Sequence, residues 1–336
     1  MIRSITARRG RSIALASLGV VLSVGAAWLA VRDVDIAAVG AILARVEPFY
    51  LLPIGAVLVA QVAVGALRWS VILTEANLGR PAVGRLVPIL LVGYLGNTVV
   101  PARLGDAGRA LLLVRREGQA PGNALGSVLL ERVIDLTTLG VLGAAAAIVV
   151  GRMQAVAVAA GTAVLLGAFV LVVAQTSLPS RLMAAMGRFR HRLVVGALAQ
   201  VDRLFRLFSA RGRRTIFVIA FGLTVIVWLL ETVTYSLASR AVGLAILPTE
   251  ALLIAAAAVF STAIPSAPGY VGTFELAASG AARALGVDPE TALAMAVFVH
   301  AVTVIPLAIA GAACLAWIGL GANPRRAADG PDEPPT

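Results

Sequence analysis

Charged residues interrupt a mostly apolar chain at NTVVPARLGDAGRALLL, residues 97–113. Arg103, Asp106 and Arg109 follow a proline that an ordinary helix cannot continue through, and Gly105 permits a tight turn with close backbone approach. The stretch DAGRALLLVRR then predicts an amphipathic helix with Asp106 as its N-cap. A helix start flanked by two guanidinium groups is a natural seat for a phosphate. The alternative is purely structural, with Asp106 capping the helix and pairing with Arg109.

A second group of charges lies inside the hydrophobic run LLERVIDLTTLGVLG. Glu131 and Asp135 are four residues apart and therefore share one helix face, and Arg132 can pair with either acid or with Asp106. Each charge near the centre of a bilayer costs several kcal/mol on insertion scales. The three residues are therefore expected to form either a ligand site or a structural ion-pair lock.

The stretch PSAPGYVGTFE contains a second interruption. Pro265, Pro268, Gly269 and Gly272 prevent a regular helix there, and Glu275 stands at its end. Unwound backbone at membrane depth is tolerated where it lines a cavity or is buried in protein. We expect this segment to contribute to a binding site, with simple loop packing as the alternative.

Two further ionisable residues occupy hydrophobic runs. Glu231 in VWLLETVTYSL is expected to be protonated or paired, and His300 in AVFVHAVTVIP could carry a proton near neutral pH. Both are candidates for a proton-linked role. A packing role for Glu231 and a neutral, hydrogen-bonded His300 are the alternatives. Pro306 follows and is expected to kink its helix.

The elements that must position these residues are hydrophobic helices. The chain is 60% hydrophobic and 13% charged, whereas soluble domains carry about 25% charged residues. We predict an all-α polytopic membrane protein with about six full spans and two short re-entrant or broken segments. The full spans are expected at 12–31, 50–73, 123–150, 154–175, 215–241 and 291–320, and the short segments at 86–101 and 251–265.

Arginine-rich segments predict the orientation, because cytoplasmic loops carry an excess of basic residues. The basic N-terminus 1–11, the loop 176–214 and the tail 321–336 are expected to be cytoplasmic. They flank two membrane halves, 12–175 and 215–320. The loop is either an amphipathic helix on the inner leaflet or an ordinary basic loop, and the tail is expected to be disordered. The expected location is the plasma or inner membrane.

Matched spacings suggest an internal repeat. The separation of Asp106 from Glu131 equals that of Glu275 from His300 (131 − 106 = 25 and 300 − 275 = 25). Each pair follows a short hydrophobic segment, a proline and a glycine turn. This pattern is typical of inverted-topology repeats in transporters, with coincidence between apolar helices as the alternative.

Composition argues against several classes of function. The single cysteine, Cys314, allows no internal disulfide, and two histidines are too few for ordinary zinc or iron chemistry, so no cofactor or metal is expected. The net charge of +11 comes entirely from arginine, and membrane topology explains it better than nucleic acid does. Because the sequence lacks a nucleophile–base pair and a nucleotide loop, we expect the protein not to be an enzyme.

Four stretches, GNTVVPARLGDAGRALLL, GSVLLERVIDL, IPSAPGYVGTFE and AVFVHAVTVIP, resemble the flippase-like integral membrane family. Its best-known member is the transmembrane region of lysylphosphatidylglycerol synthases. The resemblance implies movement of an anionic or modified phospholipid, or a lipid-linked intermediate, between leaflets. It assigns substrate binding to Arg103, Gly105, Asp106, Arg109, Glu131, Arg132 and Asp135, and to Pro265, Pro268, Gly269, Gly272 and Glu275.

The resemblance also implies partners. The synthases add a soluble aminoacyl-transfer domain after the membrane region, and this chain instead reaches its tail, so we expect it not to make an aminoacylated lipid itself. Anionic membrane lipids are the expected ligands, and a lipid-modifying synthase or glycosyltransferase is a candidate partner. Assembly into a homo-oligomer is a further possibility. Two other functions compete with transport: a membrane-embedded lipid transferase, and a non-catalytic partner of a lipid or glycan synthase.

Overall fold

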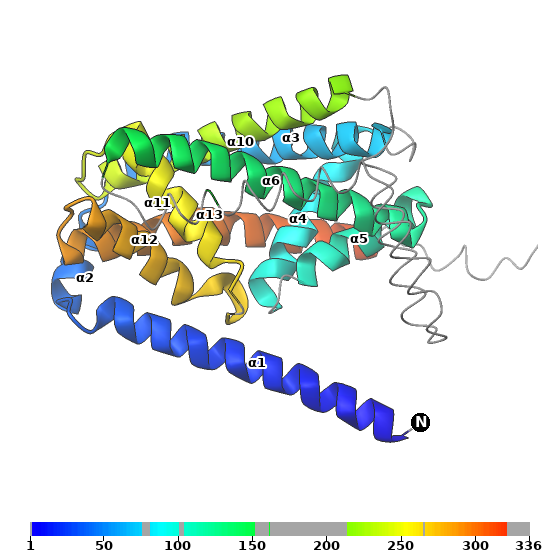
Figure 1. Cartoon of the computed structure of the whole chain (residues 1–336), viewed down its shortest axis with the longest axis horizontal. Coiled ribbons are helices and arrows are strands. Elements are labelled where there is room, and N and C mark those ends of the chain that lie inside the picture. The colour runs from blue at the N-terminus through cyan, green and yellow to red at the C-terminus, as the bar shows by residue number, and fades with distance from the viewer. Residues whose placement is uncertain are drawn as a thin grey trace, which may run out of the picture.

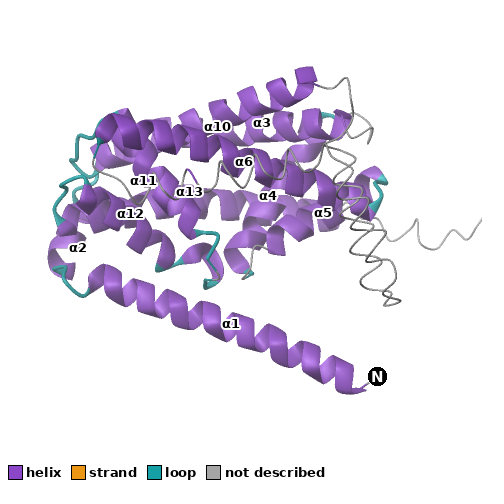
Figure 2. Ribbon diagram, viewed as in Figure 1, coloured by secondary structure: helices purple, strands orange, loops and turns teal. Residues whose placement is uncertain are grey.

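The structure is a computed structural model that describes residues 2–75, 81–100, 104–151, 161, 214–264 and 266–320. Nearly all of the expected span 154–175 and loop 176–214, together with the tail 321–336, Arg103 and Pro265, lie outside the described residues. Over the described ranges the regular elements are helices and none is a strand (Figure 2). They are α1 (Ile2–Val31), α2 (Ile36–Ala44), η1 (Pro48–Tyr50), α3 (Leu51–Glu75), α4 (Val83–Val99), α5 (Leu104–Glu117), α6 (Pro121–Val150), α10 (Arg214–Ala241), α11 (Pro248–Ser261), η2 (Pro268–Tyr270), α12 (Thr273–Ala284) and α13 (Pro289–Leu320).

Four helices are long and apolar enough to cross a membrane: Pro48–Thr74, Asn123–Val150, Val218–Ala241 and Pro289–Gly319. They coincide closely with four of the spans expected from hydropathy, and α1 covers a fifth. The prediction of a multi-pass, all-helical membrane protein is therefore confirmed.

Two helices are too short to span. The 17 residues of α4 and the 14 residues of α11 extend about 25 Å and about 21 Å, against a hydrocarbon core of roughly 30 Å. Each packs against the amphipathic helix that follows it, α4 against α5 and α11 against α12, so each pair forms a helical hairpin (Figure 1). The hairpins correspond to the two short segments expected from the sequence.

The two halves of the bundle repeat the same pairings. α3 packs against α10, α4 against α13, and α11 against α6. Across the central pair, Gln61 meets Glu231 and Arg68 meets Thr224. Seven residues separate the two contacts on each helix, which defines an antiparallel register.

Glycines bring the two helices of the first hairpin into direct backbone contact. A Cβ at Gly105 would overlap the Gly93 carbonyl oxygen and the Asn97 nitrogen, and a Cβ at Gly96 would lie 2.6 Å from the Cα of Gly105. Real Cβ atoms do not approach backbone so closely. The hairpin can therefore close only because these positions lack side chains.

The tip of the second hairpin is closed by α1. The amide of Ala267 donates to the Ser23 hydroxyl at 2.7 Å, and a Cβ at Gly272 would overlap the Ser23 carbonyl oxygen. Gly272 has φ +90°, a conformation that favours glycine. In Figure 1, α1 otherwise runs along the outside of the bundle, where it packs against the short helix α12.

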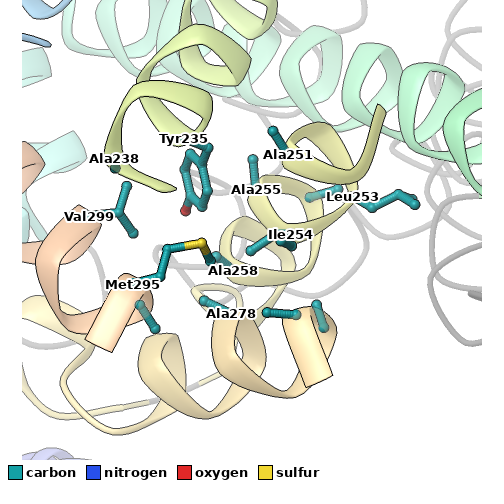
Figure 3. Packing of buried hydrophobic residues seen from close by; sticks show 14 of the residues in the cluster. Tyr235, Ala238, Ala251, Leu253, Ile254, Ala255, Ala258, Ala278, Met295 and Val299 are labelled. Carbon is teal, nitrogen blue, oxygen red and sulfur yellow. The ribbon is translucent and has the colours of Figure 1, made fainter. Parts of the chain in front are cut away.

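Small side chains fill the core of the second half. Ala251, Ala255, Ala258 and Ala278 are fully buried there, and they belong to one cluster with Met295 between α10, α11, α12 and α13 (Figure 3). Small residues allow membrane helices to approach closely, where packing replaces the hydrophobic driving force.

The prediction for the start of α5 is wrong. Asp106 is not the N-cap, because α5 begins at Leu104 and places Asp106 inside the first turn. Gly105 lies within this first helical turn and packs against α4, and it does not form a turn before the helix. The last helix is continuous, since α13 runs through Pro306 from Pro289 to Leu320.

Candidate functional site

Arg68 of α3 lies at the centre of a buried ion-pair cluster. One guanidinium nitrogen donates to Glu131 Oε1 at 2.6 Å, and the other donates to Asp135 and, at 3.2 Å, to the Thr224 hydroxyl. Glu131 and Asp135 face Arg68 together because they are one turn apart on α6. Only 4% of the surface of Arg68 is exposed, so this arginine ties α3, α6 and α10 together inside the bundle.

Arg109 of α5 is the second buried cation. Its Nη1 donates to Glu131 Oε2 at 3.0 Å, and its Nε lies 3.4 Å from Asp106 Oδ1. The guanidinium carbon is 5.0 Å from the ring centroid of Trp69, within cation–π range. The aliphatic stem crosses Gly93, where a Cβ would lie 3.0 Å from it. Arg109 is therefore buried between two carboxylates, the Trp69 ring and the backbone of α4.

Arg132 and Asp106 form the accessible edge of the cluster. The Arg132 Nε and Nη2 donate to the two oxygens of Asp106 at 3.0 and 2.9 Å, a forked pair. Nη1 lies 3.5 Å from Asp135, and the Asn97 amide donates to Asp106 at 3.4 Å. The Arg132 side chain is 28% exposed and that of Asp106 is 16% exposed, against 5% or less for Arg68, Arg109 and Glu131.

The cluster is electrically balanced. It holds three arginines and three carboxylates, and the shared pairs leave no excess charge in the apolar bundle. Balance is required because an unpaired buried charge costs several kcal/mol. Some polar atoms remain without a hydrogen bond among the described residues: Arg109 Nη2, Arg68 Nε and Asn97 Oδ1. Members of the cluster are Arg68, Asp106, Arg109, Glu131, Arg132 and Asp135.

The second hairpin holds a smaller ionisable pair. Glu275 Oε1 lies 2.5 Å from His300 Nδ1, and Glu275 Oε2 accepts from the Gly272 amide at 2.6 Å. The His300 ring stacks on Phe274 with centroids 4.2 Å apart. Glu275 thus caps α12 from inside its first turn and simultaneously joins α12 to α13.

The tips of the two hairpins meet. Gly269, in η2, has φ +70°, and a Cβ there would lie 3.5 Å from the Thr98 carbonyl oxygen near the end of α4. Tyr270 follows with φ +61°. The Pro268–Gly269 turn therefore sits against the first hairpin, close along the chain to Asn97.

The structure groups the residues singled out by the sequence into three places. Asp106, Arg109, Glu131, Arg132 and Asp135 form the cluster, with Gly105 at its hairpin contact. Pro268, Gly269, Gly272 and Glu275 form the second tip together with His300. Glu231 stands apart from both and accepts from the Gln61 amide at 2.6 Å across α3 and α10.

Sequence reasoning missed Arg68, although the signal was present. It is the only charged residue between Leu51 and Thr74 in an apolar helix, and an intramembrane arginine indicates an internal partner. Trp69 and Asn97 were also missed, because an aromatic or an amide in a hydrophobic helix carries no such signal. Within the described residues no group of three or more His, Cys, Asp or Glu could hold a metal.

Comparison with known proteins identifies the family of this chain. Residues 16–311 match the family described as the lysylphosphatidylglycerol synthase transmembrane region. This chain belongs to that family. The match includes both hairpins and the whole charged cluster, which confirms the resemblance seen in the motifs.

A relative with a different name matches over much of the same length. The glycosyltransferase AglD of Haloferax volcanii is 28% identical over 323 residues, which cover 84% of this chain and 51% of the relative. The chain therefore spans about half the length of that relative. No solved structure matches the chain. Together with its apolar helices, the family membership places this protein among multi-pass membrane proteins concerned with lipids.

Proposed function

We propose that this protein is a transporter, not an enzyme, that moves an anionic or modified phospholipid or a lipid-linked intermediate between leaflets. The observation that carries the proposal is the forked Arg132–Asp106 pair at the accessible edge of an otherwise buried cluster. A pure ion-pair lock has no need of a half-open edge. A site that receives a charged head group does.

The geometry supports an exchange of partners. A phosphate offers two oxygens to a guanidinium as a carboxylate does, so a head-group phosphate can replace Asp106 on Arg132. Asp106 would keep Arg109 and Asn97 as partners. Separating the pair without a ligand would leave Arg132 with only the longer contact to Asp135 at 3.5 Å, so the arrival of a phosphate favours opening.

The repeated pairings support an inverted repeat. A two-fold operation that places Gln61 on Thr224 also places Arg68 on Glu231 (224 − 61 = 163 and 231 − 68 = 163), and it exchanges the two contacts between α3 and α10. From the second helix of each hairpin onward, the offset is 169 (275 − 106 = 169 and 300 − 131 = 169). The longer connection between α11 and α12 accounts for the difference. Inverted repeats give transporters two alternating faces around one central site.

The directions of the hairpins fit this scheme. The start of α4 lies near the ends of α5 and α13. Arg85 of α4 is 3.7 Å from Glu117 of α5, and Arg116 of α5 donates to the Ile318 carbonyl of α13. α11 begins at the opposite end, after α10 ends (Figure 1). We propose that the hairpins are re-entrant from opposite sides, that both termini are cytoplasmic, and that the tips meet at the membrane midplane.

A second candidate function follows from the relative named a glycosyltransferase. In this alternative the chain is a non-catalytic membrane partner, or the membrane part, of a system that transfers sugars or modifies lipids. The cluster would then be only structural. Anionic lipids are the proposed ligands under the first function, whereas the second requires a partner protein as well.

Leaflet exchange in liposomes tests the proposal. Purified protein should accelerate exchange of fluorescent phosphatidylglycerol above that of protein-free liposomes. Arg132→Gln, which removes the fork at the accessible edge, should abolish the acceleration, and Arg132→Lys, which keeps the charge without the fork, should reduce it. Arg45→Gln, on an exposed arginine at the end of α2, is the matched control. Full exchange by Arg132→Gln would refute the site, and no exchange of any tested lipid by the parent would favour the partner function.

A further inference from the structure

A basic cavity lies toward the C-terminal end of α5, away from the charged cluster. It has a volume of about 430 Å³ and is formed where α4 begins and where α5 and α13 end. Arg85, Arg116 and Trp317 line it, with Gly84, Pro88 and Ile89 on the α4 side. Arg116 is about two helical turns from Arg109 along α5, so the cavity is separate from the site described above.

Among the described residues, the Arg116 guanidinium contacts an aromatic ring and a backbone carbonyl but no carboxylate. Its carbon lies 5.9 Å from the ring centroid of Trp317, and its Nη2 donates to the Ile318 carbonyl at 3.3 Å. No carboxylate lies within ion-pair distance of it among the described residues. Its remaining N–H groups are therefore available to a ligand while the indole and the carbonyl fix the direction of the fork.

Arg85 supplies a second cation on the opposite wall. Its side chain is 72% exposed, and its Nη1 lies 3.7 Å from a carboxylate oxygen of Glu117. That separation is too long for a direct hydrogen bond. The cavity therefore has two arginines against one glutamate. This excess of positive charge lies beside the apolar surface of Pro88 and Trp317. It is therefore complementary to an anion that carries an apolar body.

We propose that this cavity binds the phosphate of an anionic phospholipid, with the phosphate between Arg85 and Arg116 and the glycerol region against Pro88 and Trp317. Its volume lies within the range of about 300–1,000 Å³ that small-molecule sites occupy. Trp317 is 64% exposed and, being near the end of a spanning helix, occupies the position where tryptophans meet the lipid head groups. This bound lipid is distinct from the transported one.

The proposal is tested by binding, not by transport. The full chain is purified in a neutral detergent, and its unfolding temperature is measured with dioctanoyl phosphatidylglycerol, dioctanoyl phosphatidylcholine or inorganic phosphate at constant ionic strength. Phosphatidylglycerol is expected to stabilise the protein more than phosphatidylcholine does. In the double variant Arg85→Gln/Arg116→Gln the affinity should fall at least tenfold, because both charged donors to the phosphate are removed.

Two variants sharpen the test. Arg45→Gln/Arg240→Gln removes the same charge from exposed positions at the other end of the molecule and should keep the affinity of the parent. Gly84→Leu changes no charge, and a Cβ at position 84 meets nothing within 4 Å, so it should fold and yet obstruct the cavity. Gly84→Leu therefore still tests the cavity if the double arginine variant fails to fold.

The outcomes separate the possible ligands. Stabilisation by phosphatidylglycerol that is lost in both cavity variants and kept in the control supports the proposal. Equal stabilisation by inorganic phosphate, with the same losses, assigns the cavity to soluble phosphate and overturns the lipid assignment. Equal effects of the two lipids, or a phosphatidylglycerol effect that survives both cavity variants, overturns the site itself.

Discussion

Replacing Arg68 by methionine should strongly destabilise the protein, and the contacts of Arg68 show which carboxylate is responsible. Arg68 holds Glu131 and Asp135 in a region where it is itself 4% exposed. Removing one partner from a buried ion pair costs about 3–5 kcal/mol, because it leaves an uncompensated charge. Methionine keeps much of the volume, so a cavity contributes little to this cost.

Glu131 and Asp135 differ in the ion-pair partners that they keep when Arg68 is replaced. Glu131 keeps Arg109 at 3.0 Å, a direct hydrogen-bonded pair. Asp135 keeps only Arg132 at 3.5 Å, and the fork of that arginine is already engaged by Asp106. Most of the penalty therefore falls on Asp135. Adding Asp135→Asn to Arg68→Met restores neutrality and should recover about 1–3 kcal/mol as a coupling energy. Adding Glu131→Gln should recover less, because it also removes the direct ion pair of Arg109 and leaves that arginine with only Asp106 at 3.4 Å.

The assay is the free energy of unfolding in mixed micelles for the parent, the single variants and the two double variants. The control is Arg45→Met, on an exposed arginine at the end of α2 that belongs to neither proposed site. A surface substitution of this kind should change stability by less than about 0.5 kcal/mol. The reasoning is refuted if Arg68→Met costs no more than the control. It is also refuted if Glu131→Gln rescues as well as Asp135→Asn, because the remaining partners would then not determine the penalty.

Three close contacts give further predictions. Gly105→Ala should destabilise the protein by about 1–3 kcal/mol, because its Cβ would collide with backbone of α4. Gly108→Ala, with nothing within 4 Å, should be neutral or stabilising in the same unfolding assay. Gly272→Ala should release α1 from the second tip and speed proteolysis within α1, while Gly280→Ala, on the same helix with open space, should not. Gln61→Leu removes the donor to Glu231 and should destabilise the α3–α10 pair by about 1–3 kcal/mol. Gln61→Leu/Glu231→Leu should recover most of that loss, and an unrecovered double variant would show that Glu231 has another essential partner.

Hydropathy and proline–glycine signals were enough to predict the helices. The runs at 50–73, 123–150, 215–241 and 291–320 correspond to α3, α6, α10 and α13, because a bilayer demands long apolar helices. The hairpins were indicated by their short length and their breaks. Packing detail was not foreseeable, since it depends on which helices become neighbours. Gly105 looked like a turn residue, and only the presence of α4 beside it shows that it is an interhelical contact.

The charged cluster was predicted in composition but not in all of its partners. Glu131 and Asp135 were expected to share a face, and Arg132 was expected to reach Asp106 or an acid, and these contacts are confirmed. Arg68 completes the set from α3, across 63 residues of chain. A spacing rule within one helix cannot supply such a partner. Charge balance indicates that each buried carboxylate needs a cation, but it does not indicate which helix provides it.

The two halves carry different charges at corresponding positions, and this asymmetry bears on the proposed transport. With the offsets of the proposed repeat, Arg68 corresponds to Glu231 and Glu131 corresponds to His300. At these positions the first half has Arg68 and Glu131 of the charged cluster, whereas the second half has Glu231, bound to Gln61, and His300, paired with Glu275. In the proposed transport the contacts to the phosphate therefore come from the first half. Such a difference would favour release on the side of the second hairpin, and exchanging the two positions by Glu131→His and His300→Glu should reverse or abolish any preferred direction of lipid exchange.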